Sequence, residues 1–115
     1  MALFRPLWQF FKPPLGEPKM PQAYWIAHVH VTDAEAYGKY AALAGPAIAA
    51  HGGRFLARGG RYVQLEGTPR ERNVVAIFPS LERAVECYNS PAYSAARAHA
   101  AGACERDLMV VEAAE

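Results

Sequence analysis

The 115-residue sequence shows neither a membrane-spanning run nor a disulfide pattern. No stretch reaches the roughly 18–20 apolar residues of a membrane span. The N-terminal segment has no clean hydrophobic core and no small-residue cleavage site, so a signal peptide is not expected. Its two cysteines, Cys87 and Cys104, belong to no CxxC or His/Cys pattern. We therefore expect reduced thiols in a cytoplasmic protein.

An excess of charge of either sign is also missing. Twelve Lys and Arg oppose eleven Asp and Glu, giving a formal net charge of +1. Such a balance creates no overall field that would attract nucleic acid or a membrane. Binding of RNA on a sheet needs exposed aromatic residues beside basic ones, and RNVVAIFP (72–79) offers no such pair. Neither nucleic acid nor membrane is expected as a partner.

Familiar catalytic and cofactor motifs are absent as well. The chain has no Ser-His-Asp signature, no G-x-S-x-G and no cysteine beside a base. The glycines of HGGRFLARGGR (51–61) suggest a phosphate loop, but such a loop opens into a helix. Gly52-Gly53 instead follows a predicted helix and precedes a strand. We interpret it as a helix stop and expect no cofactor.

Residues 1–20 are expected to form an extension and linker, and residues 21–115 the folded domain. The start of the chain, MALFRPLWQFF, is rich in aromatic residues, and Pro13-Pro14 favours an extended linker. Two interpretations remain open. The extension is either an appendage ahead of a second natural start at Met20 or an aromatic arm that docks on a partner subunit or an apolar groove.

The spacing of apolar residues predicts alternating strands and helices. AYWIAHVHV is aromatic and β-branched, which is typical of a strand, and helical spacing follows from Tyr37 to Ile48. Pro46 within that helix predicts a kink or a restart. Ser90 and Pro91 have the N-cap and N1 pattern that begins a new helix. The predicted elements are strands at 23–31, 54–66, 72–79 and 106–112, with helices at 34–50 and, broken near 89–91, from 80 to 102.

The order β-α-β-β-α-β predicts a ferredoxin-like α+β fold, with a four-stranded antiparallel sheet and the helices on one face. The other face has no cover within the chain, although its residues are largely apolar. An uncovered apolar face predicts a partner, most simply a second copy related by two-fold symmetry. We expect a homodimer in which the two sheets face each other.

The strand predicted over 54–66 is too long to be straight, because it would extend roughly 43 Å at about 3.3 Å per residue. Gly59-Gly60 is where such a strand can bend. Apolar residues keep the same phase on both sides of this pair, so we expect a coil, a kink or a compensated bulge. The bent strand would give the partner subunit an arm to pair with.

Two stretches, GGRFLARGG (52–60) and YNSPAY (88–93), are the specific parts of a resemblance that covers about residues 20–113. The chain resembles the DUF1330 family, a domain of unknown function in the dimeric α+β-barrel superfamily. The resemblance implies a homodimeric barrel with a pocket between each sheet and its helices. Related families include cofactor-independent monooxygenases, lactone isomerases and haem-binding enzymes. No established catalytic residues carry over, and the extension 1–19 departs from the family pattern.

His28 and His30 lie two apart on a strand and therefore share a face. Two ligands fall short of a metal site, and His51 and His99 show no ligand spacing to this pair, so no metal is expected. One interpretation makes His28 a general base in the pocket between sheet and helices. The alternative is a histidine hydrogen-bonded within the sheet.

Tyrosines and arginines are the other candidates. Packing with hydroxyls at a rim is the default explanation for the tyrosines, but a pocket lined by phenols would suit an aromatic ligand. Two arginines four apart on one strand could clamp an anion, although ion pairs with nearby acids are favoured. We take Tyr40 with His28 as candidate catalytic residues. The candidate ligand-binding residues are Tyr24, Tyr37, Arg54, Arg58 and Tyr88.

Two classes of function follow. The first is a small-molecule enzyme with cofactor-free oxygenase or isomerase chemistry on an aromatic or acidic molecule. The second is a non-enzymatic ligand-binding or structural dimer module, whose pocket would lack converging polar groups.

Overall fold

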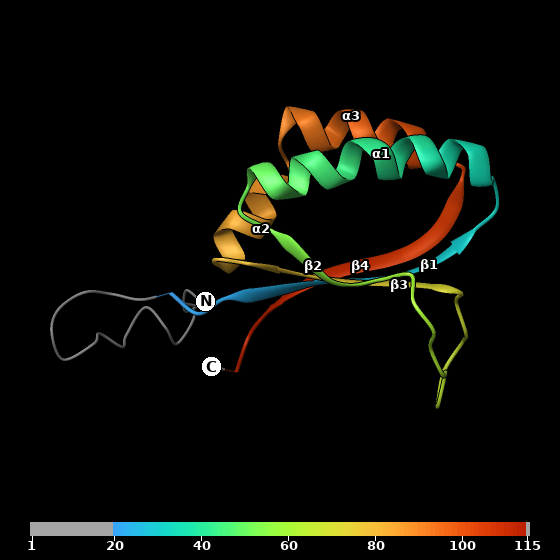
Figure 1. Cartoon of the computed structure of the whole chain (residues 1–115), viewed down its shortest axis with the longest axis horizontal. Helices are drawn as coiled ribbons and strands as arrows, with labels where there is room; N and C mark the ends of the chain where they lie inside the picture. The colour runs from blue at the N-terminus through green and yellow to red at the C-terminus, as the bar shows by residue number, and fades with distance from the viewer. Residues whose placement is uncertain (1–19, 115) are drawn as a thin grey trace, which may run out of the picture.

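The computed structural model describes residues 20–114 (Figure 1). In chain order, the elements of this part are β1 (Ala23–Val31), α1 (Ala34–Ala50), β2 (Arg54–Arg58), β3 (Arg72–Phe78), α2 (Leu81–Tyr88), α3 (Pro91–Ala100) and β4 (Cys104–Glu112). None of these helices is long and apolar enough to cross a membrane. The predicted extension falls outside the described residues, apart from Met20.

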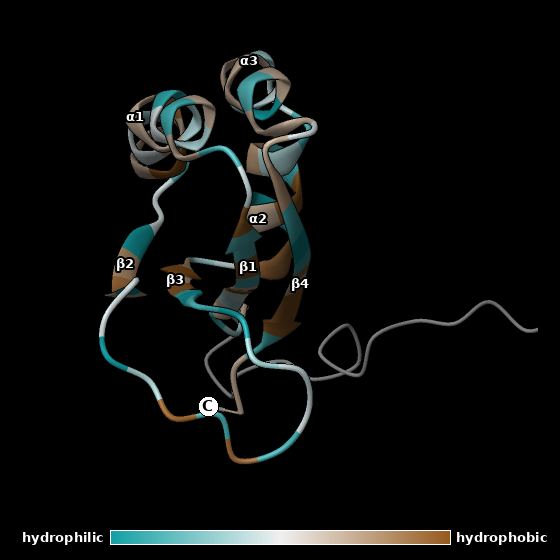
Figure 2. Ribbon diagram, turned by 90° about the vertical axis from the view of Figure 1, so that its right-hand side faces the viewer, coloured by the Kyte–Doolittle hydropathy of each residue, from teal (hydrophilic) through white to brown (hydrophobic). Residues whose placement is uncertain are grey.

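The strands form one antiparallel sheet in the order β2-β3-β1-β4. All three helices cover the same face, as Figure 1 shows from the side. In Figure 2, α1 lies over the β2 side of the sheet and α3 over the β4 side. The predicted ferredoxin-like α+β fold is therefore confirmed, including the central place of β3.

Short polar residues set the helix boundaries. The Asp33 side chain accepts a backbone N–H of the first turn of α1, and the Ser90 side chain does the same for α3, with Pro91 at its start. After α1 the chain turns at Gly52, whose φ of 83° favours glycine. Helix α1 continues through Pro46, so the predicted restart does not occur.

The two faces of β1 differ sharply in burial. Ala23, Trp25, Ala27 and Val29 are buried beneath the helices. The alternate residues between them point to the opposite, uncovered side of the sheet, which we call the open face. The hydrophobic core consequently lies between the sheet and the helices, with Tyr93 of α3 fully buried in it.

Strand β2 corrects the prediction of a strand over 54–66, because it ends at Arg58. The pairing with β3 shifts between Phe55 and Ala57, so Leu56 is the extra residue of a bulge. The chain then leaves the sheet at Gly59, whose φ is 72°. The bend expected at the glycine pair is thus the end of the strand, and a one-residue bulge precedes it.

Candidate functional site

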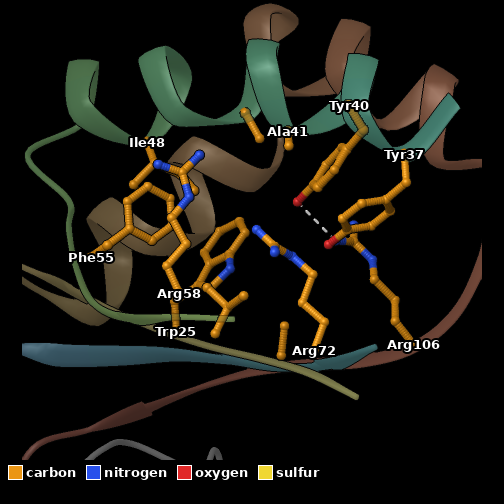
Figure 3. Close-up of a pocket in the computed structure, with 12 residues that line it drawn as sticks. Trp25, Tyr37, Tyr40, Ala41, Ile48, Phe55, Arg58, Arg72 and Arg106 are labelled. Carbon is orange, nitrogen blue, oxygen red and sulfur yellow. Dashed lines mark hydrogen bonds between the residues drawn. The ribbon is translucent and has the colours of Figure 1, made fainter. Parts of the chain in front are cut away.

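A cavity lies between α1 and the covered face of the sheet (Figure 3), and we call it the α1 cavity. Its lining comes from α1 and all four strands: Trp25, Ala27, Tyr37, Tyr40, Ala41, Ala44, Ile48, Phe55, Arg58, Arg72, Val74 and Arg106. The volume open to the centre of a water-sized sphere is about 20 Å³, room for roughly one water molecule. Figure 3 shows Arg58 and Arg72 reaching from the strands toward α1 and taking up part of the space.

A hydrogen-bonded group of two tyrosines and one arginine forms one end of the cavity. The hydroxyl oxygens of Tyr40 and Tyr93 lie 2.6 Å apart. Arg106 donates to both, at 2.8 Å to Tyr40 and 3.1 Å to Tyr93. Because Arg106 pairs with the inward-facing Val29, its side chain also lies on the helix side of the sheet. Three elements, α1, α3 and β4, therefore fix the position of the Tyr40 hydroxyl.

The protons of this group have a favoured arrangement. Burial raises the pKa of Tyr93, and the neighbouring Tyr40 raises it further, so Tyr93 keeps its proton at ordinary pH. A guanidinium can only donate, which leaves the Tyr40 oxygen as the acceptor within reach of the Tyr93 hydroxyl. Tyr40 then accepts two hydrogen bonds, and its own O–H is free to donate into the cavity.

Three arginines from three strands line the same cavity. The Arg58 guanidinium lies 4.0 Å from the centre of the Phe55 ring, and that of Arg72 lies 5.5 Å from the centre of the Tyr37 ring. The Nε of Arg72 is buried and has no hydrogen-bond partner within the described chain. Among residues 20–114, no carboxylate forms a salt bridge with Arg58, Arg72 or Arg106.

The bulge in β2 separates the two arginines that were predicted to share a face. Arg58 pairs with the inward-facing Val74, whereas Arg54 pairs with Ile77, which lies in the phase of the open face. Arg54 instead lines a groove of about 520 Å³ outside the cavity, between α1 and the edge of β2. Phe55 and Arg58 line both hollows and thus separate the α1 cavity from this groove.

His28 does not lie in the pocket between sheet and helices, so that prediction is wrong. It sits on the open face, where its Nδ1 is 2.6 Å from the side-chain oxygen of Asn73. His30 shares this face, as the two-residue spacing predicted, and its Nδ1 is 3.0 Å from Glu71. Both histidines therefore form hydrogen bonds on the open face of the sheet. Within the described residues, no cluster of three or more potential ligands could hold a metal ion.

The tyrosines predicted to contact a ligand lie in several different parts of the fold. Tyr37 and Tyr40 line the α1 cavity together with Arg58. Tyr24 lies on the open face, in register with Ile77 and hence outside the cavity. Tyr88 packs beside Trp25 in the core, and its hydroxyl accepts a hydrogen bond from Arg97 at 3.0 Å. Candidate ligand contacts at Tyr24 and Tyr88 would therefore need a surface other than this cavity.

Comparison with known proteins places the chain in a family. The model of the family described as domain of unknown function DUF1330 matches residues 22–114. The chain belongs to the DUF1330 family. No curated protein matches this DUF1330 chain.

Several solved structures share the fold of this DUF1330 domain. A protein of unknown function from Rhodopseudomonas palustris, RPA0582, is 22% identical with a TM-score of 0.70, over 83% of this chain and 84% of that one. SnoaB, a cofactor-independent oxygenase from Streptomyces nogalater, is 8% identical with a TM-score of 0.60, over 83% and 95%. A dimeric protein of unknown function and ferredoxin-like fold from Bacteroides fragilis is 16% identical with a TM-score of 0.51, over 80% and 96%. At these identities the likeness shows the fold alone.

Sequence reasoning missed three polar residues of this candidate site: Arg72, Tyr93 and Arg106. Arg72 begins the strand RNVVAIF in the same phase as the buried residues Val74 and Ala76, a signal that it points toward the helices. Arg106 likewise shares the phase of Leu108 and Val110 on β4, which pack against the core. The meeting of Tyr93 and Arg106 with Tyr40 depends on how α3 and β4 pack, which the sequence pattern does not specify.

Proposed function

We propose that this DUF1330 domain binds a small aromatic molecule in the α1 cavity and transforms it without a cofactor, in an oxygenase- or isomerase-like reaction. The observation that carries the proposal is the hydroxyl of Tyr40. It faces an aromatic-walled cavity while its oxygen lies 2.6 Å from Tyr93 and 2.8 Å from Arg106. A pocket with converging polar groups is the usual form of a small-molecule site.

The chemistry supported by this arrangement is stabilisation of an oxyanion. A hydroxylated aromatic compound that enters already ionised, as a phenolate or enolate, needs no base from the cavity lining. That anion can react with O2 or isomerise, and its oxygen carries the negative charge. A donor already in position stabilises that charge without reorganisation. Tyr40 would donate to the substrate oxygen, and the hydrogen bonds from Tyr93 and Arg106 would strengthen it as a donor because they stabilise charge on its own oxygen.

Replacing the Tyr40 hydroxyl tests this proposal. Hydroxylated aromatic and enolisable compounds are screened for turnover by absorbance and oxygen consumption. We expect Tyr40→Phe to lower kcat/KM by about 10²- to 10³-fold, as loss of one oxyanion donor does. Tyr62→Phe, which removes an exposed hydroxyl outside the α1 cavity, is the matched control and should change the rate little. Full activity in Tyr40→Phe would contradict the proposed role.

A second candidate function is ligand binding without catalysis, or a purely structural dimer. The observation that favours it is the small volume of the α1 cavity, about 20 Å³, which admits a ligand only when Arg58 or Arg72 moves aside. Saturable binding of compounds in the same screen, with no turnover of any of them, would support the binding module. Absence of both binding and turnover would favour the structural dimer.

We further propose that two copies pair through their open faces, in the cytoplasm. The open face presents half-buried or exposed apolar side chains, including Ile26, Met109 and Val111. A monomer seldom leaves such a face uncovered. The structural neighbour from Bacteroides fragilis is described as dimeric, which supports the pairing of two copies. Cys87 and Cys104 are free thiols, as expected in a reducing compartment.

A further inference from the structure

The α1 cavity contains an unusual concentration of positive charge. Arg58, Arg72 and Arg106 come from three different strands and converge on it, while no acidic side chain is part of its lining. Elsewhere in the described chain, Arg70 lies 3.1 Å from Asp107 across the open face and Arg83 contacts Glu86 one helical turn away, whereas Arg54, Arg61 and Arg97 form no salt bridge there. Ion pairing with protein acids therefore does not explain the three cavity arginines.

The surroundings of these arginines offer partial compensation for their charge. Aromatic faces contact Arg58 and Arg72, and two tyrosine oxygens accept the N–H groups of Arg106. Tyr37 and Tyr93 remain neutral, because burial raises the pKa of both. The buried Nε of Arg72 has no acceptor in residues 20–114. A half-buried guanidinium without a counter-charge is unfavourable, and a bound anion would offset that cost.

The protein backbone makes room for two of these guanidinium groups. A side chain at Gly45 in α1 would begin 3.3 Å from a terminal nitrogen of Arg58, and one at Gly59 only 2.6 Å from a terminal nitrogen of Arg72. Both glycines thus occupy positions where a Cβ atom would crowd an arginine. Glycine at these two positions therefore leaves room for the guanidinium groups beside the cavity.

We infer that the ligand of the α1 cavity is an aromatic carboxylate, held by Arg58 and Arg72 while Tyr40 donates to a second oxygen. This inference rests on the proposed function and specifies its substrate class. The guanidinium fork matches the two oxygens of a carboxylate. Arg58 and Arg72 lie over the rings of Phe55 and Tyr37 in this structure, so on binding they would swing onto the carboxylate and free those two faces for a planar ring. A free phosphate would use the same arginines but would leave these aromatic walls without a partner.

Calorimetric binding to the full chain at low salt tests the inference with two probes of the same shape. The carboxylate is 1-naphthoate and its neutral counterpart is 1-naphthamide, with inorganic phosphate as a third probe. We expect naphthoate to bind at least about tenfold more tightly than naphthamide, as charge-assisted hydrogen bonds do. Arg72→Met should weaken naphthoate about tenfold, whereas Arg83→Met, at an exposed arginine of α2 that is not part of the cavity lining, should leave it unchanged.

Other binding results would contradict the inference, the aromatic assignment or the proposed function, and these can be told apart. Equal affinity for naphthoate and naphthamide overturns the inference and leaves the proposed aromatic site standing. Phosphate binding as tightly as naphthoate, with no binding of naphthamide, overturns the aromatic assignment. If neither aromatic compound binds, both the inference and the proposed function fail. Thermal melting checks that each variant folds, and should Arg72→Met not fold, Arg72→Lys is expected to fold and to show intermediate affinity, since it keeps the charge and loses the fork.

Discussion

His28 and His30 on β1 form hydrogen bonds with different partners, and the effect of Glu71 on His30 can be measured. His30 lies 3.0 Å from one carboxylate oxygen of Glu71, while the other oxygen accepts the Val31 N–H at 2.7 Å. The hydrogen bond to Glu71, and then its charge, raise the pKa of His30 above 6.5. The same hydrogen bond, followed by that from the backbone, lowers the pKa of Glu71 from 4.5 to about 2.

This pair predicts a pH-dependent contribution to stability. The raised pKa of His30 gives stabilisation that is complete below pH 6.5 and disappears as the pH rises through the folded-state value. The lowered pKa of Glu71 gives stabilisation that is complete above pH 4.5 and is lost as the pH falls toward 2. Both are present together between pH 4.5 and 6.5. Wild type should therefore exceed Glu71→Gln in unfolding free energy most in that window.

Titration of the histidine by NMR measures the pair directly. In Glu71→Gln the pKa of His30 should fall back toward 6.5, because the carboxylate that raises it is gone. The control is Glu82→Gln, which removes an exposed carboxylate in the first turn of α2. A His30 pKa that stays the same in Glu71→Gln would show that the contact does not form in solution.

At the residue scale, spacing on β1 predicted which side chains share a face but not whether that face is covered by the helices. The alternation on β1 puts His28 and His30 together, as expected, yet only the packing of the helices shows that Trp25 and Ala27 take the inner side. The larger side chain of Trp25 favours that side, a signal present in the sequence. For the tyrosine of α3 that meets Tyr40, no such signal was available.

At the scale of elements, β2 shows how one residue changes a site. Without the bulge at Leu56, Arg58 would share the outward phase of Arg54, and the α1 cavity would hold two arginines. The sequence pattern gave no sign of it, because Phe55, Ala57 and Val63 keep an unbroken alternation. Helices, by contrast, were predicted well, since caps such as Asp33 and Ser90 act locally.

Gly59 links the end of β2 to the site, which allows a test by substitution. Its φ of 72° strains any other residue, and a Cβ would lie 2.6 Å from a terminal nitrogen of Arg72. We expect Gly59→Ala to lower the free energy of unfolding by about 1–3 kcal/mol and to weaken naphthoate binding by displacing Arg72. Gly60→Ala is the matched control, since Gly60 has a negative φ and open space around it. Equal effects of the two changes in denaturant titrations would contradict this role for Gly59.

At the scale of the whole molecule, the segment between β2 and β3 extends on the same side of the sheet as the open face. Figure 1 shows this segment projecting from the sheet on the side opposite the helices, and Figure 2 shows the same from a second direction. Its apolar residues Val63 and Leu65 are 81% and 88% exposed. The fold of one chain was predictable because its core is specified by local patterns. The role of this segment was not, because its apolar residues pack against little within the described chain.

A homodimer built on the open faces would give Leu65 a partner surface, so its replacement tests that arrangement. In a single chain Leu65 touches little, and Leu65→Asp should leave the fold of each chain intact. Burial of a leucine contributes about 1.5–3 kcal/mol, and two-fold symmetry counts it twice, so Leu65→Asp should weaken dimerisation by about 3 kcal/mol or more. Leu43→Asp, at a leucine of α1 that is 44% exposed on the helical side, is the matched control and should remain dimeric. Sedimentation of wild type and both variants over a range of concentrations gives the answer. A wild-type protein that is monomeric throughout would overturn the dimer, and a Leu65→Asp variant as dimeric as wild type would place the interface elsewhere on the molecule.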